Sequence, residues 1–136
     1  MDAFNRQILD MLQVNARESF ANIGKEVGLS APAVGKRVRQ LEEEGIIEGY
    51  TVNLNLEKLG ISTKAYITLR LSNGASGTAL AQKAISQMKE VQSCDRITGE
   101  DCLCILGYFA NNKHLIAFLE TMSGYGTSKT SIILEA

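Results

Sequence analysis

Residues 27–47 read VGLSAPAVGKRVRQLEEEGII, and this stretch decides the fold of the first part of the chain. Ser30 is a preferred N-cap residue, and Pro32 falls in the first helical turn, where its missing N–H costs nothing. Gly45 supplies a left-handed conformation that ends helices. The stretch therefore predicts a helix that begins after Ser30 and closes at Gly45.

A shorter helix is predicted directly before it. Ser19 can cap this helix, and Gly28 can end it. Its apolar positions are Phe20, Ile23 and Val27. Two helices joined by a short glycine turn form a helix-turn-helix unit, and the second helix of such a unit typically lies in the major groove of DNA.

The predicted helix after Ser30 has two different faces. Val34, Val38 and Leu41 recur at helical spacing and are expected to pack inward. At about 100° per residue, Lys36, Arg39 and Gln40 project away from this apolar stripe, and Ala33 and Gly35 lie beside them. Arg37 lies toward the edge of the stripe. The residues predicted to contact DNA are Ser30, Ala31, Ala33, Lys36, Arg37, Arg39 and Gln40. A solvated surface helix of mixed charge is the alternative interpretation.

The chain divides near position 50, where the periodicity changes. Before this point a first helix is expected after Asp2, with apolar positions Phe4, Ile8, Leu9 and Leu12. Residues 50–56 alternate apolar and polar side chains, which is typical of a strand. We therefore predict a helix-turn-helix domain over residues 1–50, a connecting strand or linker over 51–63, and a second domain over 64–136.

The second domain is predicted to follow the order β-α-β-β-α-β. Strands are expected at 64–71, 91–98, 102–109 and 129–136; one helix carries Leu80, Ala84, Ile85 and Met88, and the other carries Leu115, Ile116, Phe118, Leu119 and Met122. The strand at 102–109 is apolar throughout and is expected to be central. This order is the ferredoxin-like pattern, so the fold class is α+β. Helices cover one face of such a sheet, and the open face invites another subunit.

Composition limits the classes of function. Of 136 residues 45% are hydrophobic and 21% charged, which is the range of soluble globular proteins, and the net charge of −1 leaves room only for a local basic patch. No apolar run reaches the ~18 residues that a membrane-spanning helix needs. The first ten residues, MDAFNRQILD, lack the pattern of an export signal. We therefore expect a cytoplasmic protein that does not bind or span a membrane. No catalytic constellation, phosphate loop or metal-ligand spacing is evident, so we predict no enzyme, cofactor or metal; Cys94, Cys102 and Cys104 are interpreted as small buried thiols.

Several stretches resemble the Lrp/AsnC, or feast/famine, family of transcriptional regulators. They are NRQIL at 5–9, NARES at 15–19, VGLS at 27–30, GIIEGY at 45–50, Leu59-Gly60 and TSIIL at 130–134, together with Val34, Arg37-Val38 and Leu41-Glu42. The resemblance implies a winged helix-turn-helix domain followed by a βαββαβ domain called RAM. It also implies binding of double-stranded DNA, homodimers that assemble into octamers or larger rings, and a response to an amino acid or similar small molecule.

The resemblance places the effector near the hairpin between the second and third strands of the RAM domain and a later loop. The residues it implies are Thr98, Gly99, Glu100, Asp101, Ser123, Gly124 and Tyr125. Many members read Gly-Asp-Tyr-Asp at this hairpin, whereas this chain reads Gly-Glu-Asp-Cys at 99–102, which leaves the identity of an amino-acid effector open. The alternative function is an oligomeric metabolite sensor with weak or non-specific DNA binding.

Overall fold

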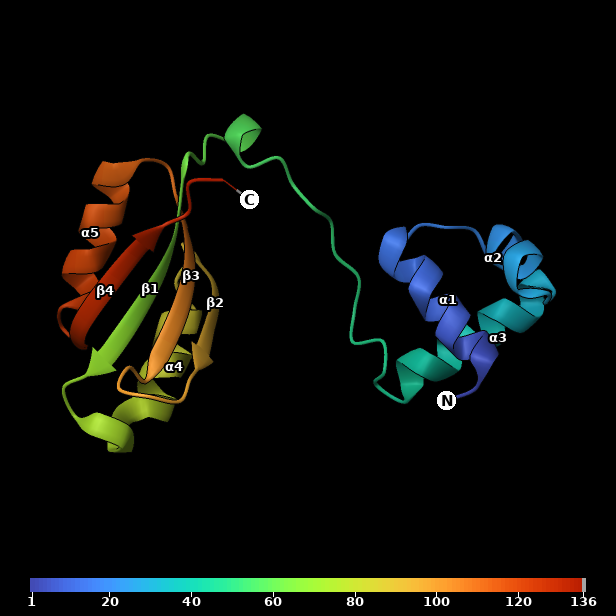
Figure 1. Cartoon of the computed structure of the whole chain (residues 1–136), viewed down its shortest axis with the longest axis horizontal. Helices are drawn as coiled ribbons and strands as arrows, with labels where there is room; N and C mark the ends of the chain where they lie inside the picture. The colour runs from blue at the N-terminus through green and yellow to red at the C-terminus, as the bar shows by residue number, and fades with distance from the viewer. Residues whose placement is uncertain (136) are drawn as a thin grey trace. The chain divides into compact units, whose positions relative to one another are not determined.

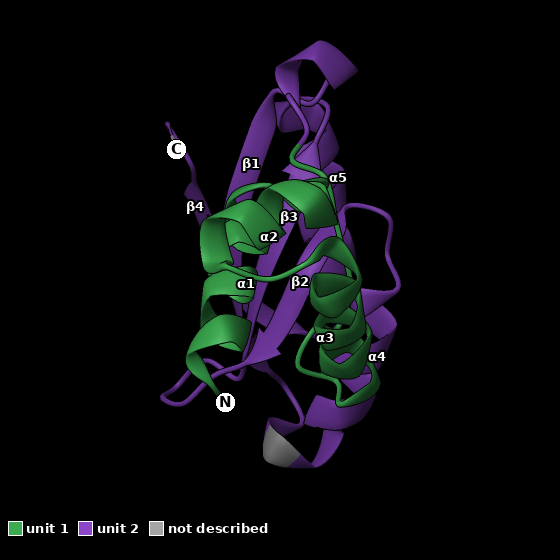
Figure 2. Ribbon diagram, turned by 90° about the vertical axis from the view of Figure 1, so that its right-hand side faces the viewer, with its two compact units in different colours: residues 1–53 green, residues 54–136 purple. Residues whose placement is uncertain are grey.

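The computed structural model describes residues 1–135, with Ala75 described by its backbone alone. The chain divides into two compact units, Met1–Asn53 and Leu54–Ala136, which Figure 2 shows in two colours. Each unit has its own cluster of buried apolar side chains.

The N-terminal unit consists of three helices, which are α1 (Ala3–Val14), α2 (Phe20–Val27) and α3 (Ala31–Glu43). The three predicted N-caps are confirmed, because the side chains of Asp2, Ser19 and Ser30 each accept a hydrogen bond from a backbone N–H three residues later. Pro32 lies in the first turn of α3, and Gly45 has φ 73° just beyond its end. Local sequence signals thus set all three helices.

The buried side chains of these helices form one small core. It contains Ile8, Leu12, Ile23, Val34 and Val38. These residues come from all three helices, so burying them holds α2 and α3 against α1. The inward positions predicted for α3 are confirmed, and Leu41 is also buried.

The strand predicted at residues 50–56 is not formed in the chain. Residues 50–55 form no regular element, Leu56 lies in a turn, and the segment pairs with no strand within the described residues. Val52 and Leu54 are 70% and 59% exposed. Alternation of apolar and polar residues defines two faces of a segment, but a strand also needs a partner for its backbone groups. A single 3-10 turn, η1 (Glu57–Leu59), follows this segment.

The C-terminal unit has the predicted order β-α-β-β-α-β. Its elements are β1 (Thr63–Leu71), η2 (Gly74–Gly77), α4 (Thr78–Ser86), β2 (Val91–Arg96), β3 (Leu103–Phe109), α5 (Asn112–Met122) and β4 (Gly126–Ile132). The four strands form an antiparallel sheet in the order β2-β3-β1-β4, and Figure 1 shows the two helices beside it. β3 is therefore central, as its continuous apolar sequence predicted.

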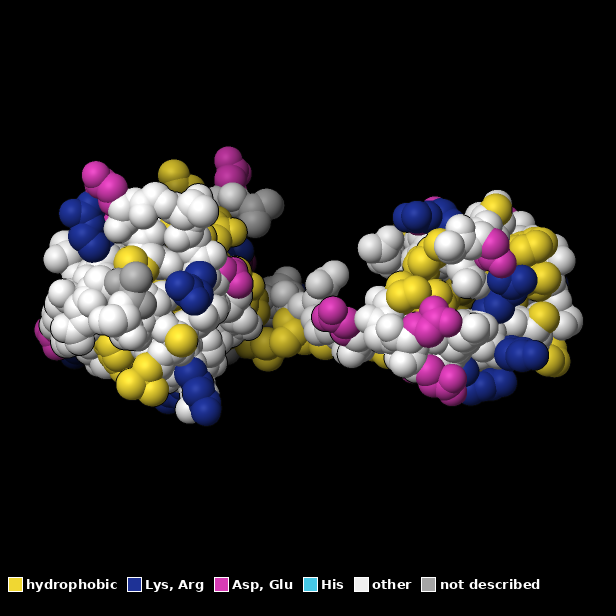
Figure 3. All heavy atoms as spheres, turned by 90° about the horizontal axis from the view of Figure 1, so that it is seen from below, with side chains coloured by type: hydrophobic (Ala, Val, Ile, Leu, Met, Phe, Trp, Pro, Cys, Tyr) yellow, Lys and Arg dark blue, Asp and Glu magenta, His cyan; other side chains and the backbone are white. Residues whose placement is uncertain are grey.

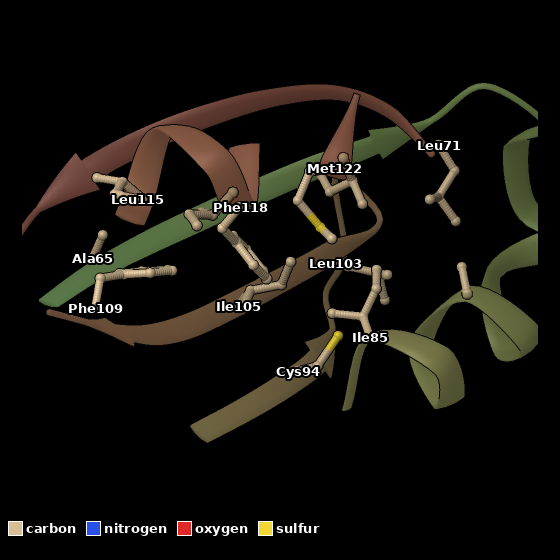
Figure 4. Close-up of a cluster of buried hydrophobic side chains, with 13 residues drawn as sticks. Ala65, Leu71, Ile85, Cys94, Leu103, Ile105, Phe109, Leu115, Phe118 and Met122 are labelled. Carbon is tan, nitrogen blue, oxygen red and sulfur yellow. The ribbon is translucent and has the colours of Figure 1, made fainter. Parts of the chain in front are cut away.

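One face of the sheet is covered by the helices. Along β1, the buried residues Ala65, Ile67, Leu69 and Leu71 alternate with more exposed ones. They pack against Ile85 from α4 and against the buried apolar residues of α5, as Figure 4 shows. The open face carries the alternate residues, among which Tyr66 is 49% exposed.

Some details of the C-terminal unit differ from the prediction. Leu80 and Ile116 are 77% and 56% exposed, because the helix phase turns Ala81 and Leu115 toward the sheet instead. β4 begins at Gly126, earlier than the predicted 129, and ends at Ile132; Ala136 lies outside the described residues. Alternation alone does not fix where a strand starts, since the start depends on the pairing of Leu71 with Gly126.

The three thiols are not equally buried. Cys94 is buried, and burial raises the pKa of its thiol above the ordinary value. Cys102 and Cys104 are half-buried, so their predicted burial was wrong in degree. Cys104 lies on the open face because it alternates with the buried Leu103 and Ile105 along β3.

None of the helices formed by residues 1–135 is long and apolar enough to cross a membrane.

Candidate nucleic-acid interface and effector region

A tight turn holds α2 against α3. The backbone N–H groups of Gly28 and Leu29 both donate to the carbonyl oxygen of Gly24, at 2.8 and 2.9 Å. Gly28 has φ 83°, a left-handed conformation that favours glycine. A Cβ atom on Gly24 would lie 2.3 Å from the carbonyl oxygen of Leu29, so the turn passes directly over that residue. The helix-turn-helix geometry therefore requires glycine at both positions.

The face of α3 that points away from the core is polar. Lys36, Arg39 and Gln40 are exposed. Lys36 and Arg39 take part in no ion pair within residues 1–135. Gln40 donates a hydrogen bond to the carboxylate of Glu44 at 3.2 Å. This face thus presents two cations and one amide to solvent.

The beginning of α3 presents small residues. Ser30 Oγ accepts a hydrogen bond from the N–H of Ala33 at 3.2 Å, and Ala31 and Ala33 are half-buried. Small side chains at a helix N-terminus leave room for a close approach, and the backbone N–H groups there favour anions. The structure therefore brings the predicted residues of the first turn beside Lys36 on one helix.

Arg37 does not join this face. Its Nη1 atom lies 2.6 Å from Asp2 Oδ2 and 3.1 Å from Asn5 Oδ1, and its guanidinium carbon lies 5.0 Å from the ring centroid of Phe4. All three partners belong to the start of α1 or to its cap. Arg37 is thus turned toward α1, although the sequence placed it among the DNA-contacting residues.

Gly35 also does not lie on the outer face of α3, where it was predicted. It is buried, and a Cβ atom there would lie 3.2 Å from the ring of Phe20. The absence of a side chain at Gly35 therefore serves the packing of α2 on α3. Helical periodicity could not separate these roles, because Gly35 and Arg37 both lie between the buried stripe and the outer face.

The charge of the N-terminal unit is mixed. Residues 1–50 contain six Lys and Arg residues and eight Asp and Glu residues. On the side of this unit drawn in Figure 3, cations, acids and apolar side chains are interspersed. Electrostatic attraction to phosphate groups therefore has to come from local cations and not from the net charge of the unit.

In the C-terminal unit, the predicted effector residues of the β2–β3 hairpin lie in a cluster of four charges. Arg70 forms an ion pair with Glu100 and lies 4.0 Å from Asp101, while Lys129 Nζ lies 3.7 Å from Asp101. Asp101 has a side chain that is only 19% exposed. Thr98 and Gly99 form the exposed tip of the same hairpin. The acids of the hairpin are therefore already neutralised by cations from β1 and β4.

The other predicted effector residues adjoin a separate hollow of about 390 Å³. Its lining residues are Leu71, Ser72, Asn73, Gly77, Leu80, Ala81, Ala84, Gly124 and Tyr125. None of them carries a charge. Ser123 is not among them, and its hydroxyl donates to the carbonyl oxygen of Glu120 at 2.6 Å. The hollow lies on the helix side of the sheet, whereas Arg70 and Lys129 lie on the open face, so the single chain does not join the two groups.

Comparison with known protein families gives a match for the N-terminal unit and another for the C-terminal unit. The AsnC-type helix-turn-helix domain matches residues 1–42, and the Lrp/AsnC ligand binding domain matches residues 64–136. The chain belongs to the Lrp/AsnC family. The expected helix-turn-helix domain followed by a βαββαβ (RAM) domain is thereby confirmed, whereas the described residues of the N-terminal unit form no wing strand. The chain is an Lrp/AsnC-type transcriptional regulator.

Relatives of this Lrp/AsnC protein match along almost its whole length. The leucine-responsive regulatory protein of Escherichia coli is 31% identical, and the match covers 99% of this chain and 85% of the relative. The HTH-type transcriptional regulator LrpA of Bacillus subtilis is 30% identical, with 98% of each chain covered. Both matches therefore extend across both domains of this chain.

Solved Lrp/AsnC structures superpose closely on the chain. Bacillus subtilis LrpC has a TM-score of 0.91 at 26% identity, covering 100% of this chain and 96% of LrpC. Escherichia coli AsnC has a TM-score of 0.88 at 25% identity, covering 100% and 93%. A feast or famine regulatory protein from M. tuberculosis, solved in complex with L-methionine, has a TM-score of 0.89 at 25% identity, covering 99% and 92%.

Sequence reasoning missed several residues of this Lrp/AsnC protein. Arg70 and Lys129 neutralise the hairpin acids, but their meeting depends on the register of β1 with its two neighbouring strands. Leu80 was expected to be part of the core, and it instead borders the hollow. The sequence did carry a signal for this, because the buried residues Thr78, Ala81 and Ile85 lie at positions i, i+3 and i+7, which is also a helical spacing.

Proposed function

We propose that the outer face of α3 binds double-stranded DNA in the major groove and gives this regulator its sequence specificity. The observation that carries the proposal is the state of the cations on this face. Lys36 and Arg39 are exposed and, within the described part of the chain, have no acidic partner. Cations without a partner bind phosphate or guanine without first breaking an internal ion pair.

Each residue of the proposed interface has a chemical role. The guanidinium of Arg39 matches the two acceptors of guanine, and the amide of Gln40 matches adenine. Lys36 suits a phosphate group. Ser30, Ala31 and Ala33 lie at the N-terminus of α3, where small side chains let backbone N–H groups approach a phosphate.

Two single substitutions test this interface. Replacing Lys36 with alanine is expected to weaken binding of all DNA sequences and to lower the slope of log K against log salt by about one. Replacing Arg39 with alanine is expected to cost about 1–3 kcal/mol and to relax specificity at one base pair. Both are measured by fluorescence anisotropy over a salt series on a genomic fragment that the wild-type protein selects.

The matched control for these variants is Lys113→Ala. Lys113 is an exposed cation on α5 of the C-terminal unit, so this change alters the net charge equally. We expect it to leave affinity and salt slope unchanged. If both α3 variants also bind like the wild type, α3 is not the DNA-binding face.

A metabolite sensor with weak or non-specific DNA binding is the second candidate function. The excess of acidic over basic residues in residues 1–50 favours it. A steep salt dependence and a strong preference for selected fragments would support the regulator, since non-specific binding lacks the second property. A change of assembly size on addition of amino acids, without DNA affinity, would support the sensor.

We propose that the effector is an amino acid with an uncharged side chain. The hollow beside Tyr125 has a lining without charges, and apolar pockets take apolar groups. The cluster of Arg70, Glu100, Asp101 and Lys129 offers both signs of charge, which match the ammonium and carboxylate groups of a free amino acid. Because the hollow and this cluster lie on opposite sides of the sheet, a neighbouring subunit is needed to bring them together.

Filling the hollow tests the effector proposal. Ala84 lines the hollow, and Ala84→Phe is expected to occupy much of its volume. A ligand at about 100 times its Kd stabilises the folded state by about 2.7 kcal/mol. We expect L-methionine or L-leucine to raise the melting temperature of the wild type but not of this variant, as measured by differential scanning fluorimetry.

The adjacent Lys83→Ala variant serves as the control for the hollow. Lys83 is exposed and does not line it. This variant is expected to respond to amino acids like the wild type. A full response from Ala84→Phe would place the effector elsewhere in the assembly.

We further propose that the regulator acts as a homodimer and assembles into larger rings. Exposed apolar residues support self-association, since Tyr66 lies on the open face of the sheet, and Val52 and Leu54 lie in the unpaired segment. A unit of about 50 residues buries only ~60% of its unfolded surface, so added burial between subunits stabilises it. Light scattering with and without DNA fragments measures the assembly.

A further inference from the structure

We propose that Arg37 is a positioning residue, which fixes the rotation of α3 on α1 so that Lys36, Arg39 and Gln40 face the DNA. This inference rests on the proposed DNA-binding role of α3. It assigns to Arg37 no contact with DNA. The latch, as we name the contacts of Arg37 with Asp2, Phe4 and Asn5, joins two parts of the sequence more than thirty residues apart.

The latch combines two hydrogen bonds from one nitrogen of the guanidinium with a cation–π contact. Nη1 donates to Asp2 Oδ2 at 2.6 Å and to Asn5 Oδ1 at 3.1 Å, and the group lies over the ring of Phe4 at 5.0 Å. Within residues 1–135, these are the side-chain hydrogen bonds that connect α1 with α3. Burial of Val34 and Val38 sets which side of α3 faces the core, and these hydrogen bonds add a directional contact to that packing.

The carboxylate of Asp2 links the latch to the start of α1. Its Oδ1 atom accepts the N–H of Asn5 at 2.8 Å as the helix cap, and its Oδ2 atom accepts from Arg37 at 2.6 Å. The hydrogen bond from Arg37, followed by the one from the Asn5 backbone, holds the pKa of this carboxyl below its usual value. The side chain of Asp2 therefore caps α1 and also holds α3, through Arg37.

Because of the position of Arg37 around α3, its contact with α1 helps determine which side chains of α3 point outward. At about 100° per residue, Arg37 lies about 100° from Lys36 and about 160° from Arg39 around the helix axis. A rotation of α3 that carried Arg37 into a DNA groove would turn Arg39 away from it. The side chain of Arg37 is 29% exposed, whereas the outer side of α3 carries Lys36 and Arg39 as exposed residues.

The variants Arg37→Met and Asp2→Asn test the latch together. Methionine keeps much of the aliphatic stem, and asparagine keeps the cap of α1, since Asn is a good N-cap. We expect each to weaken binding of the selected fragment by about 2- to 10-fold, with the double variant no weaker than either single one. The slope of log K against log salt should stay at the wild-type value, because no phosphate contact is removed.

The sign of the Asp2→Asn effect distinguishes the two roles of Arg37. If Arg37 instead contacted phosphate, removal of the nearby negative charge would release it and strengthen DNA binding. Arg37→Met would then also lower the salt slope by about one. Either result overturns the inference. The inference is also overturned if Arg37→Met and Asp2→Asn both bind DNA with wild-type affinity while Lys36→Ala binds weakly.

The control is Asp10→Asn, which removes an exposed negative charge from the same helix. Asp10 forms no ion pair within the described residues. We expect this variant to bind DNA as tightly as the wild type or slightly more tightly. Loss of affinity here would show that any removal of charge from α1 weakens binding, and the latch would lose its support.

A readout without DNA separates the latch from the proposed function. Amide hydrogen exchange in the first turns of α1 and α3 should be faster in Arg37→Met and in Asp2→Asn than in the wild type. If the wild-type protein bound no DNA at all, the proposed function would fail while this exchange result still reported on the latch. Unchanged exchange in both variants would overturn the latch regardless of DNA binding.

Discussion

Replacing Gly24 with alanine is expected to lower the stability of the N-terminal unit by about 3 kcal/mol and to weaken DNA binding. The added Cβ atom would lie 2.3 Å from the carbonyl oxygen of Leu29 and 3.3 Å from its carbonyl carbon, which are backbone atoms that cannot rotate away. Overpacking of this kind costs about 3 kcal/mol. At roughly 0.05–0.15 kcal/mol per residue, a unit of this size has only about 3–8 kcal/mol to lose.

This result is measured by the thermal unfolding of residues 1–53 within the full chain, followed by circular dichroism, and by a band-shift assay. The matched control is Gly49→Ala, because a Cβ atom on Gly49 would meet nothing within 4 Å. The control is expected to unfold at the wild-type temperature. Wild-type stability in Gly24→Ala would mean that the turn between α2 and α3 is looser than described here.

Replacing Phe109 with alanine is expected to destabilise the C-terminal unit by about 3–5 kcal/mol. Phe109 is fully buried, its ring centroid lies 5.2 Å from that of Phe118, and its ring lies edge-on to His114 at 5.5 Å. The ring also occupies the space above Gly107, where a Cβ atom would meet it at 2.6 Å. Figure 4 shows Phe109 within this core, beside Phe118 and Ile105. Its loss leaves a cavity that this rigid sheet cannot close.

Urea unfolding of the full chain, followed by tyrosine fluorescence and circular dichroism, measures this loss. Phe109→Leu keeps part of the volume and is expected to lose clearly less stability than Phe109→Ala. Lys113→Ala, an exposed change nearby on α5, is expected to fall within about 0.5 kcal/mol of the wild type. Equal stability of the alanine and leucine variants would contradict the packing described for Phe109.

The helices could be predicted because their signals are local. Ser19, Gly28 and Ser30 act through hydrogen bonds and backbone angles within a few residues, so the sequence alone defines where α2 ends and α3 begins. The strand predicted at residues 50–56 is absent from the described single chain for the opposite reason. Strand formation depends on a partner, and no described residue of the same chain supplies one for this segment.

The candidate sites were predictable only in part, because some of their side chains are placed by contacts with residues that are distant in the sequence. The outer position of Lys36 and Arg39 follows from helical spacing and agrees with the structure. Arg37 differs because its partners lie at the start of α1, and spacing along α3 carries no information about them. The neutralisation of Asp101 by Lys129 likewise depends on two strands that meet only in the folded sheet.

The two clusters of buried apolar residues have a consequence for how such a protein can evolve. The buried members of one cluster lie between Ile8 and Val38, and those of the other lie between Ala65 and Met122. A recombination point at residues 54–62 therefore splits neither set. A gene fusion there could join this helix-turn-helix domain to a different ligand-binding domain, or this ligand-binding domain to a different DNA-binding domain. The buried core of each domain would stay unchanged.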